Sequence, residues 1–316
     1  MHVVPNRLVS DAGALLVEWR AGDGGRFGEP FFEETLARYR RDGGALTTTP
    51  LAALEAGGAD PAALVFHVSR CGSTLVSRML AALPGHLAVS EAPIFDDLLR
   101  QDVGDEGRRI RLLRGAAEAM VASQAEQTDR LFIKLDCWHI FHLDLLRRAF
   151  PTAALLFVHR DPVEVAVSLM RMPGLTLVRG VVTPVQLGLT VDARNALARE
   201  ENVAAILGAF FREAAAHREA LTSIPYADLP GVLLDSVPDL TLSADDRALM
   251  LAAAGRDAKS PGQTFTPDAA TKRAEADPAV LEAVARLAEP QYRRWLGTCT
   301  SVRVPGQATD AEGDTH

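Results

Sequence analysis

Lysine and cysteine are both scarce in this chain. Of the 33 basic residues only three are lysines, namely Lys134, Lys259 and Lys272. There are likewise three cysteines, widely spaced along the sequence: Cys71, Cys137 and Cys299. An odd and sparse set of cysteines argues against a disulfide-based fold and indicates a reducing compartment. No two of them form the C-x-x-C pair that a structural zinc site of standard spacing uses.

Long apolar runs and excess positive charge are also missing. No apolar run approaches the roughly 18–20 residues that cross a bilayer, and the N-terminal residues lack the basic-then-apolar pattern of a secretory signal. The net charge of −8 disfavours binding to long nucleic acid, which depends on neutralising phosphates. We therefore expect a cytoplasmic protein with no nucleic-acid or membrane partner. A small anionic ligand is compatible with this charge, because a deep site focuses its own local field.

The 316 residues have an ordinary globular composition, with 48% hydrophobic and 23% charged residues. We expect residues 1–60 to form an N-terminal appendage, residues 61–304 an α/β domain, and residues 305–316 a disordered tail. The appendage is predicted to contain a hairpin and a helix, over residues 2–9, 14–19 and 31–41.

Short apolar runs alternate with helical patterns in the first half of the α/β domain. Strands are predicted over 64–68, 87–89, 131–135 and 154–158, with a late strand over 231–235. Helices are predicted over 74–83, 139–150, 194–221, 243–254 and 278–296, and from residue 162 onward. This order predicts a three-layer α/β fold, similar to that of P-loop nucleoside triphosphatases, with a central parallel sheet and a helical C-terminal part. Ligands of such sheets bind beyond the carboxyl ends of the strands.

The segment Phe66-His-Val-Ser-Arg-Cys-Gly-Ser-Thr-Leu75 joins the first strand to a helix. A small-residue turn that runs into a helix N-terminus directs backbone N–H groups and partial positive charge at one place, which favours phosphate. An ordinary tight turn capped by Ser73 would use the same residues. The segment is not a standard P-loop, because His67 and Ser73 stand where that pattern requires Gly and Lys.

Two motifs together resemble those of the sulfotransferases. Residues 69–75 resemble the 5′-phosphosulfate loop of that family, although Ser69 and Cys71 replace its usual proline and serine. Val158-His-Arg-Asp-Pro-Val-Glu-Val-Ala-Val-Ser168 is similar to the family's second motif, in which a strand-end arginine and a serine eight residues later bind a 3′-phosphate. The resemblance implies 3′-phosphoadenosine 5′-phosphosulfate as co-substrate. The donor-binding residues it implies are Arg70, Cys71, Gly72, Ser73, Thr74, Leu75, Arg160 and Ser168.

The resemblance also implies catalytic roles for residues at the same rim of the sheet. Glu91 is expected to be the base that deprotonates the acceptor, although an acidic residue there could simply stabilise the helix that follows. Lys134, with Arg70, is expected to stabilise the departing oxygen. A structural salt bridge from Lys134 to Asp136 or another carboxylate is the alternative.

Asp136 and His139 are expected to lie in the acceptor pocket, and His139 is a second candidate base. The spacing of Cys137, His139 and His142 fits no standard zinc pattern, so we expect no metal. Residues 265–273 loosely resemble the basic loop that closes over the nucleotide in sulfotransferases, which implies donor contacts from Lys272 and Arg273. A solvated loop is the alternative for these two cations.

The sequence thus predicts a sulfotransferase that transfers a sulfuryl group to a hydroxyl or amine of a small-molecule acceptor. Two alternatives stay open: an ATP-dependent P-loop small-molecule kinase, and a non-catalytic nucleotide-binding protein of the same fold. The identity of the acceptor and the oligomeric state are not encoded in any motif that we recognise.

Overall fold

The structure is a computed structural model that describes residues 2–255 and 276–297. The predicted donor residues Lys272 and Arg273, the whole of the loop over residues 265–273, and the predicted tail lie outside the described residues. At the centre is a five-stranded sheet in the order β5-β6-β4-β7-β8, and every pair of neighbouring strands is parallel. Its strands are β4 (Ala63–His67), β5 (His86–Ser90), β6 (Arg130–Lys134), β7 (Ala154–His159) and β8 (Leu221–Pro225). The predicted parallel α/β fold is confirmed.

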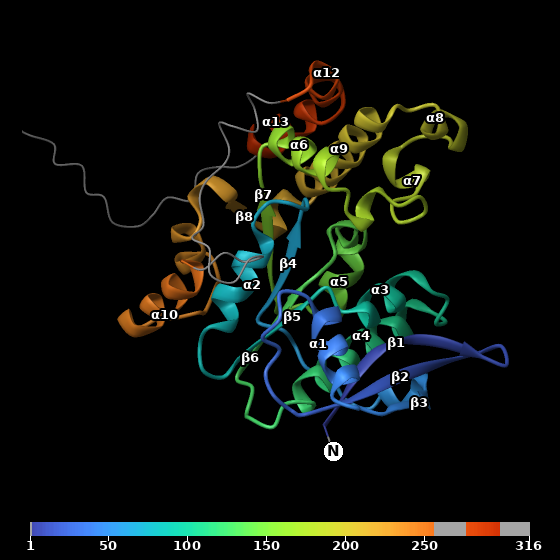
Figure 1. The fold of residues 1–316 in the computed structure, drawn as a ribbon, viewed down its shortest axis with the longest axis vertical. Helices are drawn as coiled ribbons and strands as arrows, with labels where there is room; N and C mark the ends of the chain where they lie inside the picture. Colours follow the sequence, from blue (N-terminus) through green and yellow to red (C-terminus); the bar gives the residue numbers. More distant parts are fainter. Residues whose placement is uncertain (1, 256–275, 298–316) are drawn as a thin grey trace, which may run out of the picture.

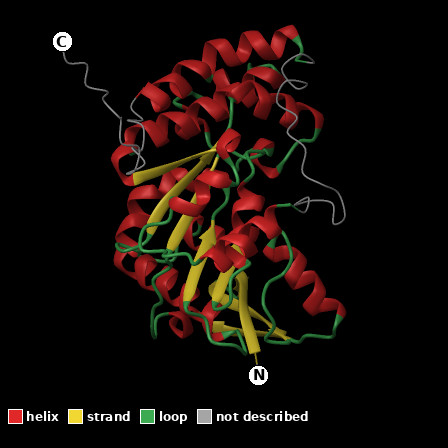
Figure 2. Cartoon of the chain, turned by 90° about the vertical axis from the view of Figure 1, so that its left-hand side faces the viewer, coloured by secondary structure: helices red, strands yellow, loops and turns green. Residues whose placement is uncertain are grey.

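Helices flank the sheet (Figures 1 and 2). Those that follow or cover its strands are α2 (Ser73–Ala81), α3 (Pro93–Arg100), α4 (Glu106–Ala122), α5 (Leu143–Ala149), α6 (Pro162–Arg171), α9 (Arg199–Ala216) and α10 (Ala244–Ala254). In Figure 1, α2 and α10 lie on one side of β4 and α5 lies on the other. Residues of β4 and β5 are buried throughout, as expected for strands covered on both faces.

The fifth strand differs from the prediction. Residues 231–235 form a short 3₁₀ helix, η6 (Gly231–Asp235), in which only Leu233 is buried. The strand that completes the sheet is β8, which pairs in parallel with β7. Of its residues only Leu221 falls within the helix predicted over 194–221, and no element is predicted for residues 222–225. These residues form a strand because β7 offers them a hydrogen-bonding neighbour at the edge of the sheet. A single sequence does not reveal such a neighbour.

Other predicted helices are divided in the structure. Residues 139–150 split into η2 (Cys137–His142) and α5, and residues 194–221 into α8 (Val191–Asn195) and α9. The last predicted helix splits into α12 (Pro278–Leu287) and α13 (Glu289–Gly297). Pro290 lies at this last break, where it lacks the N–H that a continuous helix would need. The helix α4 was not predicted.

The N-terminal part forms an antiparallel sheet of β1 (His2–Asp11), β2 (Ala14–Gly22) and β3 (Leu46–Pro50), of which β3 was not predicted. The helix α1 (Phe32–Arg41) lies between β2 and β3 in the chain. The N-terminal part packs on α3 and α4, as the lower part of Figure 1 shows. The buried Leu8 N–H donates to the carboxylate of Asp97, at 2.8 Å. A Cβ atom at Gly115 would lie 1.5 Å from the carbonyl oxygen of Leu54, so only glycine permits this approach. Among the described helices, none combines the length and hydropathy needed to span a bilayer.

Candidate active site

The turn after β4 has a strained backbone. Ser69 and Arg70 have positive φ angles of 67° and 48°, and Gly72 has a φ of 86° just before α2 begins. Left-handed conformations are costly for residues other than glycine and cluster at ligand sites. Successive backbone N–H groups in a turn can form a concave nest that binds anions. This geometry supports anion binding at the start of α2.

Gly72 also lies close to a residue that we did not predict. A Cβ atom at Gly72 would approach the ring of Tyr226 to 2.8 Å and a methyl group of Leu229 to 3.1 Å. The same Tyr226 ring lies under the guanidinium of Arg160, whose Cζ is 4.0 Å from the ring centroid. Tyr226 therefore connects the two motifs. Tyr226 follows β8 directly, and because β8 was not predicted, the position of Tyr226 could not be predicted either.

The second motif lies on the strand next to the loop. β7 pairs with β4 up to His67, which is opposite Val158, and the Cys71 thiol donates to the Val158 carbonyl oxygen at 3.1 Å. Arg160, at the end of β7, is buried with 6% exposure, and its Nε lies 2.5 Å from a carboxylate oxygen of Glu164. Ser168 is half-buried in the second turn of α6. Both predicted phosphate motifs thus begin at the carboxyl ends of adjacent strands.

A cavity of about 340 Å³ opens beside the loop. Five predicted site residues line it: Arg70, Ser73, Thr74, Glu91 and Asp136. His67 contributes from β4, and Phe31, Trp138, Met172 and Leu175 supply apolar walls. Neither Lys134 nor His139 is among the lining residues. The structure therefore brings the predicted loop and the predicted base, Glu91, together at one cavity. Lys134 is buried next to the cavity and does not line it.

Glu91 and Lys134 form a buried ion pair. Lys134 Nζ lies 2.7 Å from Glu91 Oε1, the lysine side chain is 1% exposed, and the Phe31 ring covers the ammonium at 4.7 Å. No acceptor among the described residues meets its N–H groups at hydrogen-bonding angles, so the contact with Glu91 is chiefly electrostatic. Burial alone would raise the pKa of Glu91, but the charge of Lys134 and the contacts with His67 together outweigh it and lower the pKa to about 2. Glu91 is therefore ionised throughout the physiological range.

His67 orients the same carboxylate. Its Nδ1 accepts a hydrogen bond from the Ser69 N–H at 3.1 Å, so the ring proton must reside on Nε2. That Nε2 donates to the Leu135 carbonyl oxygen at 2.9 Å and lies 3.4 Å from Glu91 Oε1. Burial lowers the pKa of His67, and the neutral tautomer is consistent with all of these contacts. His67 links the loop backbone to the candidate base.

His139 is occupied on both ring nitrogens. Its Nδ1 accepts from the Asp136 N–H at 3.2 Å, and its Nε2 contacts Asp96 Oδ1 at 2.9 Å. The Trp138 indole N–H donates to the same Asp96 oxygen at 2.7 Å. The ligand atoms of Asp96, Asp136 and His139 lie within 4.8 Å of one another, but the protein's own hydrogen bonds already use the His139 nitrogens. These contacts favour a structural role for His139 over a role as base or metal ligand.

We expect the binding of an anionic ligand in this cavity to weaken as the pH rises through 7. Burial raises the pKa of Asp136 to about 7, and the negative charges of Glu91 and Asp96 add to this effect. Above that pH a second carboxylate in the cavity becomes negative and repels an anionic ligand. Calorimetry with inorganic sulfate, whose charge is constant in this range, at pH 6 and 8 should show about three- to tenfold weaker binding at pH 8. Asp136→Asn should remove this change; an unaltered pH dependence in the variant would assign it to another group.

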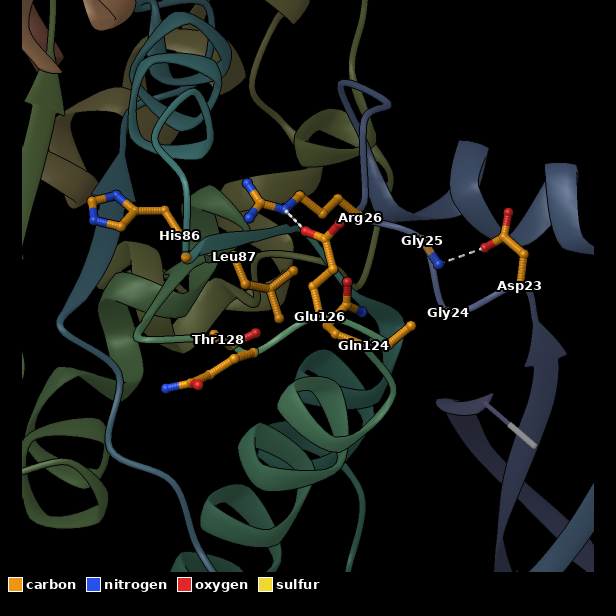
Figure 3. Close-up of a pocket in the computed structure, with 12 residues that line it drawn as sticks. Asp23, Gly24, Gly25, Arg26, His86, Leu87, Gln124, Glu126 and Thr128 are labelled. Atoms are coloured by element: carbon orange, nitrogen blue, oxygen red, sulfur yellow. Dashed lines mark hydrogen bonds and ion pairs between the residues drawn. The ribbon is translucent and has the colours of Figure 1, made fainter. Parts of the chain in front are cut away.

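A separate cavity of about 210 Å³ lies at the opposite end of the sheet (Figure 3). His86 and Leu87 at the start of β5 line it, and Arg26 pairs with Glu126 there at 3.3 Å. The Glu126 side chain is 74% exposed, so this ion pair is weak. None of the motif residues contributes to this cavity, and we assign it no function.

Comparison with known proteins identifies a family for this chain. A family model described as "Sulfotransferase family" matches residues 61–231, which is more than half of the chain. No curated protein matches the chain. Solved structures that resemble it include sulfotransferase STF9 from Mycobacterium avium, with 14% identity, a TM-score of 0.49, and coverage of 78% of this chain and 79% of that one. A sulfotransferase from Alicyclobacillus acidocaldarius shares 19% identity with a TM-score of 0.44, covering 76% of this chain and 95% of that one.

The sulfotransferase domain from the Synechococcus PCC 7002 olefin synthase shares 17% identity with a TM-score of 0.47, covering 74% of this chain and 95% of that one. Structural likeness of this degree adds nothing to the assignment, which depends on the family model. The matched region contains both anion motifs, Glu91, Lys134 and Tyr226. The chain belongs to the sulfotransferase family and is an enzyme that transfers sulfuryl groups.

Proposed function

We propose that this sulfotransferase uses 3′-phosphoadenosine 5′-phosphosulfate as donor and a hydroxyl or amine of a small molecule as acceptor. One observation carries the proposal. The two anion motifs begin on adjacent strands, and the ring of Tyr226 lies against both Gly72 and Arg160. A ligand with phosphates at two ends of one nucleoside fits such an arrangement better than a linear triphosphate does.

The loop and the start of α2 would hold the 5′-phosphosulfate. Ser73 and Thr74 are buried at the first turn of α2, where free backbone N–H groups and the helix dipole favour an anion. Arg70, which lines the same cavity, would add a full positive charge. Arg160 and Ser168 would bind the 3′-phosphate, which must compete with Glu164 for the Arg160 guanidinium.

In the proposed reaction the acceptor oxygen or nitrogen attacks the sulfur in line with the bridging oxygen. The bond between sulfur and that oxygen breaks, 3′-phosphoadenosine 5′-phosphate leaves, and Glu91 takes the acceptor proton. A carboxylate paired with Lys134 is a weak base in the free enzyme. Negative charge of the bound donor would attract Lys134 and raise the pKa of Glu91, which strengthens the base once the donor is in place.

Lys134 keeps Glu91 ionised and oriented in the free enzyme, because the two groups lie 2.7 Å apart. Its predicted contact with the departing oxygen stays a prediction, as do the assignments of Cys71 and Leu75 to the donor site. Arg70 is the cation that lines the cavity and is therefore our first choice for stabilising the departing oxygen. The division into residues 1–60 and 61–304, and the cytoplasmic location, also stay predictions.

An ATP-dependent kinase is the less favoured alternative. It would need magnesium and a lysine at the position of Ser73 to contact the outer phosphates. We expect turnover of 3′-phosphoadenosine 5′-phosphosulfate with a phenolic acceptor in the presence of EDTA, measured as release of 3′-phosphoadenosine 5′-phosphate. ATP should give no phosphorylated product under matched conditions with magnesium. Phosphoryl transfer from ATP, with no sulfuryl transfer from the first donor, would reverse the assignment.

A further inference from the structure

The segment between α6 and α9, residues 172–197, is called here the arm. It contains three short helical turns, η3 (Leu175–Leu177), α7 (Pro184–Leu187) and α8 (Val191–Asn195). Few of its side chains are buried, Val182 and Leu187 among them. The arm therefore owes little of its position to an apolar core of its own.

Arginine side chains hold the arm through its backbone. Arg70 donates to the Met172 carbonyl oxygen at 2.9 Å, and Arg100 donates to that of Gly180 at 2.8 Å. Arg194 and Arg212 donate to the carbonyl oxygens of Val182 and Gln186. These bonds fix the backbone and leave the side chains free to face outward.

Five of the arm's exposed side chains are large and apolar. Met172, Leu175, Val178, Val185 and Val191 are between 51% and 84% exposed. They make up half of the large apolar side chains that are exposed in the described part of the chain. Scattered exposed apolar residues need no explanation, but a concentration within one short segment indicates a binding surface.

This surface continues into the active-site cavity. Met172 and Leu175 line the cavity together with Glu91, and Phe31 and Trp138 extend the apolar wall inside it. The Met172 carbonyl oxygen is bound by Arg70, the residue that we assign to the donor. A molecule whose reactive group faces Glu91 would therefore have its remaining part close to the arm.

We propose that the arm binds the hydrocarbon part of an amphiphilic acceptor, a molecule with one hydroxyl or amine and an alkyl or alkyl-aryl body. The inference rests on the proposed function, since it assigns a class of acceptor to the same cavity. The phosphate and sulfate groups of the donor gain nothing from this surface, and its adenosine is proposed to lie between Gly72 and Arg160, so the exposed side chains of the arm are left for the acceptor. Contact with Met172, Leu175 and Val178 removes their apolar surface from water and selects for chain length.

The test uses 4-ethyl-, 4-butyl- and 4-hexylphenol as probes, titrated by calorimetry into the enzyme with and without 3′-phosphoadenosine 5′-phosphate. Each added methylene group should strengthen binding by about two- to fourfold, so that hexylphenol binds at least about 15-fold more tightly than ethylphenol. In the double variant Met172→Gln/Leu175→Asn this ratio should fall below about fivefold. The matched control Leu249→Asn/Leu251→Asn removes two exposed leucines of α10, which does not line the cavity, and should keep the wild-type ratio.

The two proposals can fail separately. An unchanged chain-length ratio in the arm variant, or no dependence on chain length in the wild type, would overturn the acceptor class even if the nucleotide binds as proposed. Absence of nucleotide binding would overturn the donor assignment, while the titrations without nucleotide still report on the arm. If the arm variant instead converted a dimer to a monomer and left the ratio unchanged, the surface would be an interface between copies of this chain, and the inference would be wrong.

Discussion

Glu91→Gln should reduce kcat by about 10²- to 10⁴-fold, the range usual for loss of a positioned general base. The substitution keeps the size of the side chain but removes the only proposed proton acceptor that lines the cavity beside the loop. It also removes the counter-charge of the buried Lys134. Donor affinity should therefore stay the same or increase, because the cavity becomes more positive. Steady-state kinetics and calorimetry with 3′-phosphoadenosine 5′-phosphate measure the two effects separately.

The stability of that variant needs its own control. An uncompensated buried ammonium costs several kcal/mol, of the order of 3–5 kcal/mol in related cases. The double variant Glu91→Gln/Lys134→Met removes both charges and should recover stability in thermal unfolding without recovering activity. Activity within tenfold of the wild type in Glu91→Gln would show that another group accepts the proton. Loss of both nucleotide binding and stability in the double variant would indicate a structural role only.

Arg160→Ala should weaken binding of 3′-phosphoadenosine 5′-phosphate by about 30- to 1000-fold and leave the affinity for ADP almost unchanged. The range corresponds to roughly 2–4 kcal/mol for a charge-assisted contact to phosphate. Arg160 follows β7 directly and is buried, so its guanidinium is shielded from water and a charge-assisted contact with it is strong. The expected change is therefore specific to the ligand that carries a 3′-phosphate.

Two further variants serve as controls for the effect of Arg160→Ala on nucleotide affinity. Removing Arg160 leaves Glu164 without the guanidinium that it contacts, and its negative charge would repel a phosphate. The double variant Arg160→Ala/Glu164→Gln removes this repulsion and isolates the lost contact. Arg148→Ala, at an exposed arginine paired with Glu106, is the matched control and should bind both nucleotides as the wild type does. An equal loss of affinity for ADP and for the 3′-phosphorylated ligand would mean that Arg160 supports the fold and not the 3′-phosphate.

The sequence is most informative for features that depend on residues close together in the chain. The alternation of buried apolar runs and helical patterns predicted the parallel sheet, and the small-residue turn around Gly72 predicted where a strand meets a helix. Glu91 and Lys134 were both assigned to the carboxyl ends of strands, where the structure has them. These features depend on neighbours close in the chain or on the direction common to all strands of a parallel sheet.

The sequence was least informative where distant segments meet. The pairing of Lys134 with Glu91, and the Phe31 ring above it, join segments more than 40 residues apart. The sequence offers a salt bridge from Lys134 to Asp136 or another carboxylate as an alternative, and in the structure the carboxylate that pairs with Lys134 is Glu91. Tyr226 was missed because β8 was missed, and the arm carries no motif at all. Tertiary contacts, which local patterns do not record, determine each of these.

The ratio of dissociation constants for ADP and 3′-phosphoadenosine 5′-phosphate, measured by calorimetry on the wild-type enzyme, tests the two-phosphate site most directly. A site that holds phosphates at both ends of the nucleoside predicts that ADP binds at least about 30-fold more weakly. Equal dissociation constants would contradict it, because they would show that Arg160 and Ser168 contribute nothing to recognition of the nucleotide.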